Sequence, residues 1–412
     1  MNVLLSAYAC MPNAGSEPGY GWNWTLRLAE RGMNVTVLTR GVGRERIAAY
    51  MAAHPNPRIS FEFLDVPLKG LKNGRAWHYL IWQTMAASVA KKLHTQKNFD
   101  VAHHVTFTSV HVPTQIWRTG IPTVFGSVGG GQIAPDCMLS YFAGGQRQER
   151  VRTLLTRALA HSRWHRRVFR ELDLILAANT DTLNLVRSLS PGNVEMLSDV
   201  GVPESDLAPY PKLFAHQGPP RLLWVGRMLP RKALPLALDA LAKSTSGATL
   251  TIVGDGLPVA HVQQLLAERG VTDRVTWAGR RLSLEEVKVA YQEHDAFLFT
   301  SLRDTCGVQL LEAMAAGLPI ITLNLHGARD LVPNAGSYKI NVVAPEQVVT
   351  DLAQAIDSFS SSTQAEMQAM SRENLTFAKT CTWTERARQA EDIYRRILTK
   401  PSTGTHTSAN SH

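Results

Sequence analysis

Residues 297–322 read FLFTSLRDTCGVQLLEAMAAGLPIIT, and the order of apolar and polar residues in this stretch decides the fold. Phe297-Leu298-Phe299 predicts a short buried strand, and Gly307 and Gly317 mark the start and the end of a helix. Pro319 then leads into a second apolar run, Ile320-Ile321-Thr322. A strand, a helix and a second strand in this order form the repeating unit of parallel α/β sheets.

The same alternation extends in both directions along the chain. Short apolar runs at residues 222–226, 250–254, 275–277, 297–299 and 319–322 predict the strands of one α/β unit. An earlier set lies at residues 3–7, 35–39, 59–64, 101–104, 123–125 and 174–177. Prolines cluster between the two sets, which indicates a linker. We therefore predict two α/β domains that face each other across a cleft, with ligands bound beyond the carboxyl ends of the strands.

The predicted boundaries follow from this alternation. They are a first domain at 1–205, a linker at 206–220, a second domain at 221–382, a closing helix at 383–398 and a disordered tail at 399–412.

The composition excludes several classes of protein. Of the 412 residues 44% are hydrophobic and 19% are charged, so the chain is not disordered as a whole. Its four cysteines are scattered without metal-ligand spacing, which argues against a zinc module and favours a cytoplasmic setting. Residues 1–8 lack a basic segment, so we expect a buried strand there and no signal peptide. The net charge of +9 suits an acidic partner: nucleic acid, an anionic membrane or a phosphorylated substrate.

Charged residues stand where two of the predicted strands of the second domain end. Arg227, Arg231 and Lys232 follow the first of these strands, where they could hold a diphosphate; a solvated basic turn is the alternative. Asp304 follows the strand quoted first, and Glu312 comes seven residues later, inside the predicted helix. Carboxylates near a helix N-terminus can accept sugar hydroxyls while the exposed N–H groups hold phosphate.

Two features of the first domain are further candidates. The first strand runs into a glycine-rich loop at residues 13–21, whose backbone N–H groups could approach an anion. Its spacing is not that of a dinucleotide-binding loop, which weakens a dehydrogenase interpretation. His103 and His104 close the fourth strand and point to opposite faces, so only one of them can face a cleft. An ordinary turn and ordinary packing are the alternatives.

Together these residues resemble the retaining, nucleotide-sugar-dependent glycosyltransferases of the GT-B fold, the large family that makes bacterial polysaccharides and glycolipids. The resemblance extends from residues 15–19 to the helix at 383–398. Its strongest part is residues 304–319, which resemble the E-x7-E segment of the family with its LEAMAxGxP continuation. Residues 225–232 and 252–256 resemble two other signatures of the donor-binding domain. The fold expected from this resemblance is GT-B, with two Rossmann-like domains.

The resemblance also implies roles for individual residues of the second domain. Arg227 and Lys232 would hold the diphosphate of the donor, and Glu312 would hold its ribose. Asp304 stands in the place of a glutamate and would act as a catalytic group that touches the hydroxyls of the donor sugar. Aspartate is shorter by one methylene, so this contact is altered or made through water.

Further roles are implied around the cleft. Gly15 would let the first loop approach the phosphates, Gly307 would open the donor-binding helix, and Arg281 would border the nucleobase. The family carries a histidine in the cleft after the fourth strand, which assigns a catalytic role to His103 or His104.

The expected reaction moves a sugar from a nucleotide-sugar to a sugar, polysaccharide or lipid-linked acceptor. Because arginine, lysine and helix N–H groups can stabilise the departing diphosphate, we expect neither a metal nor a cofactor. Two alternatives stay open: a nucleotide-sugar epimerase on the same fold, and a non-catalytic protein that binds sugar nucleotides or glycolipids. A nucleic-acid-binding protein is suggested by the charge alone, and no nucleic-acid-binding motif supports it.

Residues 147–170 contain eight arginines and one acid, Glu149. Val151, Leu154, Leu155, Ala158 and Leu159 recur in this stretch at helical spacing. The pattern predicts a basic amphipathic helix that rests on an anionic membrane, with Trp164 and Phe169 near the lipid headgroups. The alternative is a surface helix that packs the apolar stripe on its own domain.

Overall fold

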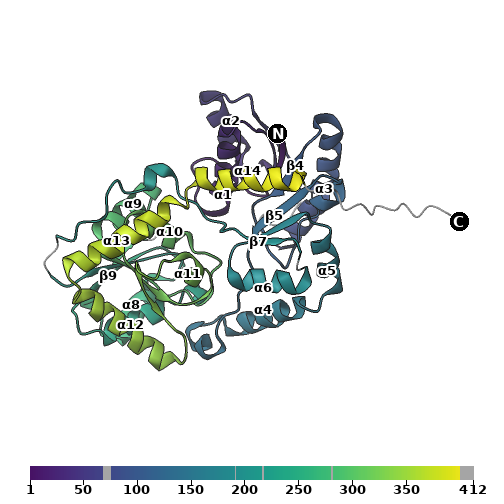
Figure 1. Cartoon of the computed structure of the whole chain (residues 1–412). Helices are drawn as coiled ribbons and strands as arrows, with labels where there is room; N and C mark the ends of the chain where they lie inside the picture. The colour runs from purple at the N-terminus through teal and green to yellow at the C-terminus, as the bar shows by residue number, and fades with distance from the viewer. Residues whose placement is uncertain (68–75, 191, 216–217, 280–281, 400–412) are drawn as a thin grey trace.

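The structure is a computed structural model that describes residues 1–67, 76–190, 192–215, 218–279 and 282–399. It contains two parallel sheets packed between helices, which confirms the predicted α/β class with two Rossmann-like domains (Figure 1). The linker predicted at 206–220 lies between the last strand of one sheet and the first strand of the other. The tail predicted at 399–412 lies outside the described residues, except for Thr399.

The first sheet has seven parallel strands in the order β3-β2-β1-β4-β5-β6-β7. They are β1 (Asn2–Ser6), β2 (Asn34–Thr39), β3 (Ile59–Phe63), β4 (Val101–His104), β5 (Thr123–Val128), β6 (Leu174–Ala177) and β7 (Val194–Met196). The helices around it are α1 (Ser16–Glu30), α2 (Arg44–Ala53), α3 (Ala76–Lys97), α4 (Gln146–Leu159), α5 (Arg163–Arg170) and α6 (Thr180–Leu189).

The central strand β1 shows why these apolar runs are uninterrupted. Leu5 packs in one layer with Trp24 of α1, while Leu4 packs in the opposite layer with Trp82 of α3. Because both faces of the strand are covered by helices, every side chain must be apolar or satisfied internally.

The second sheet has six parallel strands in the order β10-β9-β8-β11-β12-β13. They are β8 (Arg221–Val225), β9 (Thr249–Val253), β10 (Val275–Gly279), β11 (Ala296–Phe299), β12 (Ile320–Leu323) and β13 (Ser337–Ile340). Its helices are α7 (Leu234–Lys243), α8 (Val259–Glu268), α9 (Leu284–Glu293), α10 (Val308–Ala315), α11 (His326–Leu331), α12 (Pro345–Ser360) and α13 (Gln364–Lys379).

The last helix, α14 (Trp383–Thr399), crosses from the second domain back to the first, where it lies across α1 (Figure 1). The chain crosses between the domains twice, and the two crossing segments pair: the Val202 N–H donates to the Cys381 carbonyl at 3.1 Å, and the Trp383 N–H donates to the Val202 carbonyl at 3.0 Å. Trp383 then packs edge-on against Trp24, with ring centroids 6.0 Å apart. These contacts tie the two crossing segments to each other and to the first domain.

Candidate active site

The candidate site lies where β8 and β11 end at the carboxyl edge of the second sheet. Lys232 Nζ donates a hydrogen bond to Asp304 Oδ2 in a close contact. Arg231 lies 3.2 Å from the same oxygen, and Ser301 Oγ donates to it at 3.3 Å. The Asp304 side chain is 17% exposed and that of Lys232 is 6% exposed. The structure therefore joins two residues that the sequence placed on separate loops.

The charge of Asp304 follows from these neighbours. Burial alone would raise the pKa of this carboxyl, but the positive charges of Lys232 and Arg231 outweigh burial and hold the pKa below its usual value. The Thr305 N–H donates to the second carboxylate oxygen at 3.1 Å, which also favours the ionised form. Asp304 is thus a carboxylate with two cations beside it.

Glu312 lies in the second turn of α10, between the buried residues Leu311 and Ala313. Its Oε2 accepts a hydrogen bond from the Tyr291 hydroxyl of α9 at 2.9 Å. Burial raises the pKa of Glu312 above its usual value, although the bond from Tyr291 opposes this shift. Because the Tyr291 hydroxyl occupies only part of its acceptor capacity, the Glu312 carboxyl can still accept hydrogen bonds from a ligand.

Two glycines, Gly254 and Gly307, shape the loops around the site. Gly254 has a φ of +146°, and a Cβ built on it would lie 1.9 Å from the carbonyl oxygen of Gly226. The two loops that follow β8 and β9 can touch only because Gly254 has no side chain. Gly307, with a φ of +78°, precedes the first residue of α10 and turns the Asp304 loop into the helix.

The first loop of the first domain reaches toward the second domain. A Cβ on Gly15 would lie 3.8 Å from Leu284 of α9. Two residues later, Glu17 accepts a hydrogen bond from the Phe107 N–H at 2.8 Å. Burial raises the pKa of Glu17 to about 7, and the negative charge of Asp199 adds to this shift.

Polar contacts hold the two domains together beside the site. Arg303, the residue before Asp304, donates to both carboxylate oxygens of Glu149 on α4, at 2.6 and 2.9 Å. Thr305, the residue after Asp304, is bound from the first domain by Gln132 at 3.0 Å and by Asn179 at 2.9 Å. The Asp304 loop is therefore held from both sides.

His103 and His104 point to opposite faces of the first sheet, as predicted, and both are fully buried. His103 contacts the Tyr394 hydroxyl of α14 at 2.6 Å and the Gly126 carbonyl at 2.9 Å. His104 contacts the hydroxyls of Ser6 and Tyr79, each at 2.8 Å. Burial lowers the pKa of His103 to about 4 and that of His104 to about 3, so both are neutral. Both nitrogens of each ring are bound within the protein, and this placement lends no support to a catalytic role.

Two further predicted residues are Arg227 and Arg281. Arg227 is exposed to solvent, and Arg281 lies outside the described residues. Sequence reasoning missed the bond from Tyr291 to Glu312 and assigned no role to Glu17. Only the cluster of cations after β8 was a signal for the contact between Arg231 and Asp304.

A cavity of about 620 Å³ lies between the domains, lined by residues of β7, α11 and α14 together with Cys306. Neither Lys232, Asp304 nor Glu312 lines it, so it is separate from the candidate site. Among the described residues, no group of three or more histidine, cysteine or acidic side chains could hold a metal ion. In the same part of the chain, no helix is long and apolar enough to cross a membrane.

Comparison with known proteins finds a family match within the second domain. Residues 219–362 match the family described as "Glycosyl transferases group 1". The chain is 29% identical over 144 residues to 2-deoxystreptamine glucosyltransferase of Streptomyces kanamyceticus, which covers 34% of this chain and 36% of that protein. It is also 29% identical over 147 residues to the GDP-mannose-dependent alpha-(1-6)-phosphatidylinositol monomannoside mannosyltransferase of Mycobacterium tuberculosis, covering 33% of this chain and 37% of that protein. The matches thus span little more than a third of these relatives.

Solved structures resemble the whole chain. Sucrose-phosphate synthase of Thermosynechococcus elongatus has a TM-score of 0.67 at 18% identity, covering 96% of this chain and 99% of that chain. HepE of Anabaena, solved in complex with UDP and glucose, has a TM-score of 0.57 at 16% identity, with coverages of 96% and 99%. The protein therefore has the GT-B fold, and its second domain matches the group 1 glycosyl transferase family.

Proposed function

We propose that the protein is a glycosyltransferase that moves a sugar from a nucleotide-sugar donor to an acceptor hydroxyl, with retention of the anomeric configuration. The observation that carries this proposal is the contact of Lys232 and Arg231 with Asp304 at the carboxyl edge of the second sheet. This cluster lies within the segment that matches the family.

The residues of this cluster suit the chemistry. Lys232, Arg231 and the first N–H groups of α10 would neutralise the diphosphate as its bond to the anomeric carbon breaks. The ionised Asp304 would accept hydrogen bonds from hydroxyls of the donor sugar. The acceptor oxygen would attack on the face from which the diphosphate departs and pass its proton to the leaving phosphate, so no separate base is needed.

The choice of donor is open to a direct test. HepE of Anabaena has been solved with UDP-glucose, which supports a UDP-sugar, whereas the mycobacterial relative is named as GDP-mannose-dependent. The name of the mycobacterial relative includes a phosphatidylinositol monomannoside, which supports a glycolipid acceptor, whereas the name of the Streptomyces relative includes the small molecule 2-deoxystreptamine.

The experiment incubates the protein with UDP-glucose, GDP-mannose or ADP-glucose and a set of sugar and lipid-linked acceptors. We expect one donor to give a glycoside with the same anomeric configuration as the donor, as determined by NMR spectroscopy. An inverted product would overturn retention, and a rearranged sugar nucleotide formed without any acceptor would identify an epimerase instead.

A further inference from the structure

The helix α4 has its polar and apolar faces in the reverse of the usual arrangement. Its inner face buries Glu149 and Thr156, which are 4% and 2% exposed. Its outer face presents Val151, Leu154 and Leu155, which are 56%, 64% and 59% exposed. Ordinary surface helices bury their apolar stripe against the core. Val151, Leu154, Leu155 and Ala158 of the predicted stripe are thus turned to solvent. Leu159 is 8% exposed and packs in the core of the first domain, so the alternative of packing on its own domain holds for this residue alone among the five.

The polar inner face explains how α4 is held without burying that stripe. Glu149 accepts both hydrogen bonds from Arg303 of the second domain. Arg152 donates to the carbonyls of Gln132 at 2.8 Å and of Gly130 at 3.0 Å. These charged contacts hold the inner side of the helix, and Val151, Leu154 and Leu155 stay exposed on its outer face.

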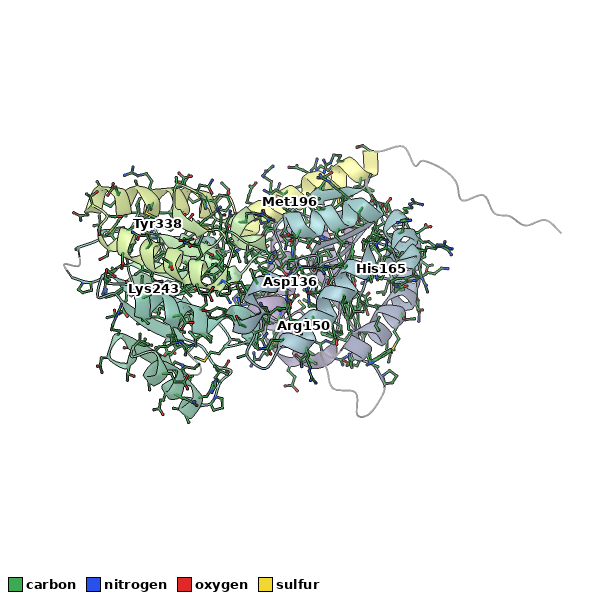
Figure 2. All side chains as sticks on the ribbon, turned by 90° about the horizontal axis from the view of Figure 1, so that it is seen from below. Asp136, Arg150, His165, Met196, Lys243 and Tyr338 are labelled. Atoms are coloured by element: carbon green, nitrogen blue, oxygen red, sulfur yellow. The ribbon has the colours of Figure 1, made fainter. Side chains whose placement is uncertain are left out.

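Basic residues surround the stripe. Arg147, Arg150 and Arg157 are exposed on α4, and Trp164 at the start of α5 is 48% exposed. Figure 2, which views the molecule from below, shows Arg150 beside the junction of the two domains. Phe169, predicted to lie near lipid headgroups, is instead fully buried in the first domain.

We propose that this outer surface docks on an anionic lipid bilayer. The docking surface consists of Val151, Leu154, Leu155, Ala158 and Trp164 with Arg147, Arg150 and Arg157. An apolar stripe flanked by arginines matches the acyl boundary and the negative headgroups of such a bilayer. A second copy of the chain on the same surface would bring equal charges together, and nucleic acid would leave the leucines without a role. Charge complementarity therefore favours lipid.

The position of α4 gives this docking a consequence for the site. The ion pair of Glu149 with Arg303 joins the inner face of the helix directly to the loop that carries Asp304. A bilayer bound to the outer face of α4 would therefore lie on the far side of the helix from that loop, with the helix between lipid and site.

The test is flotation of the intact protein with vesicles of phosphatidylcholine alone and of phosphatidylcholine mixed with phosphatidylglycerol. We expect binding to the anionic vesicles only, weakened by salt. Each arginine near an anionic surface contributes about 1 kcal/mol, so Arg147→Gln with Arg150→Gln should weaken binding about 30-fold. Leu154→Gln with Leu155→Gln should remove it.

The matched control is Val343→Gln with Arg372→Gln, which changes an exposed apolar and an exposed basic residue of the second domain. This variant should bind like the original protein, and all variants should keep their circular dichroism spectrum. Equal binding to both kinds of vesicle, no binding at low salt, or an equal loss in the control would overturn the proposal. The proposal would also be overturned if the original protein formed a dimer and bound no vesicles, and if Leu154→Gln with Leu155→Gln dissociated this dimer.

Discussion

Glu149 and Arg303 form a two-point ion pair between the domains, with N–O distances of 2.6 and 2.9 Å. The Glu149 side chain is 5% exposed and that of Arg303 is 18% exposed. This pair joins α4, the helix whose outer face is the candidate membrane surface, to the residue that precedes Asp304.

Removing one partner of this pair should destabilise the protein. Glu149→Gln leaves the Arg303 charge unpaired and poorly solvated. Breaking a buried ion pair in this way typically lowers the free energy of unfolding by about 3–5 kcal/mol. Urea unfolding of Glu149→Gln, Arg303→Gln and the double variant measures the effect. We expect the double variant to lose less than the sum of the single variants, and strict additivity would show that the two side chains do not interact.

Lys232→Ala should lower kcat/KM for transfer by about 10- to 100-fold, since a hydrogen bond that involves a charged group contributes about 1.5–3 kcal/mol. Initial rates at low donor concentration provide the measurement. The exposed-residue variant Arg372→Gln serves as the control, and a near-normal rate in Lys232→Ala would remove Lys232 from the donor site.

Glu312→Ala should act mainly on donor binding, because the proposed contact of Glu312 is with the ribose, away from the reacting bond. The expected result is a raised KM for the donor with a smaller change in kcat. Glu312→Gln keeps an acceptor for the Tyr291 hydroxyl, so its KM for the donor should lie between that of the original protein and that of Glu312→Ala. A drop in kcat with an unchanged KM would contradict this assignment.

Asp304→Asn should change how the stability of the protein depends on pH. The pKa of Asp304 lies below its usual value in the folded protein, so its charge stabilises the fold above about pH 4 and this stabilisation fades as the pH falls through the folded value. Asp304→Asn should therefore be less stable than the original protein at neutral pH, with the difference shrinking in acid. Urea unfolding of both proteins at neutral and at acidic pH tests this. A difference in the free energy of unfolding that stays constant with pH would show that the charge of Asp304 contributes nothing.

Glu17→Gln should change the pH dependence of stability in the opposite sense. Burial raises the pKa of Glu17 to about 7, so the folded protein holds a proton that the unfolded chain releases near pH 4.3. Stability should fall as the pH rises between these values, by up to about 1.4 kcal/mol for each pH unit. Glu17→Gln should flatten this slope. Part of it should remain, because burial also raises the pKa of Asp199 to about 6.

The fold was largely predictable because its central strands are continuous apolar runs. Residues 101–104 and 174–177 match β4 and β6 at both ends. The edge strands β7 and β13 were missed, since β7 has one buried residue, Val194, and β13 has none. An edge strand that is half exposed lacks the apolar pattern from which a strand is predicted.

The site was predictable only where a single segment carries it. The segment with Asp304 and Glu312 could be found from its spacing, and Lys232 from the cluster after β8. The contacts that set the charges join residues far apart in the chain: Glu149 meets Arg303 across 154 positions. The spacing of apolar residues along the chain carries no information about such pairs. The apolar stripe of α4 could be seen in the sequence, but the direction in which it faces depends on the ion pair between Glu149 and Arg303.

The most direct test of the account is thermal unfolding of the protein with a panel of UDP-, GDP- and ADP-sugars. A ligand at about 100 times its dissociation constant stabilises the folded protein by about 2.7 kcal/mol. We predict that one class of nucleotide-sugar raises the unfolding temperature of the original protein and of Arg372→Gln, and that Lys232→Ala shows a much smaller response. The absence of any response across the panel, or an unchanged response in Lys232→Ala, would contradict a nucleotide-sugar site at Lys232 and Asp304.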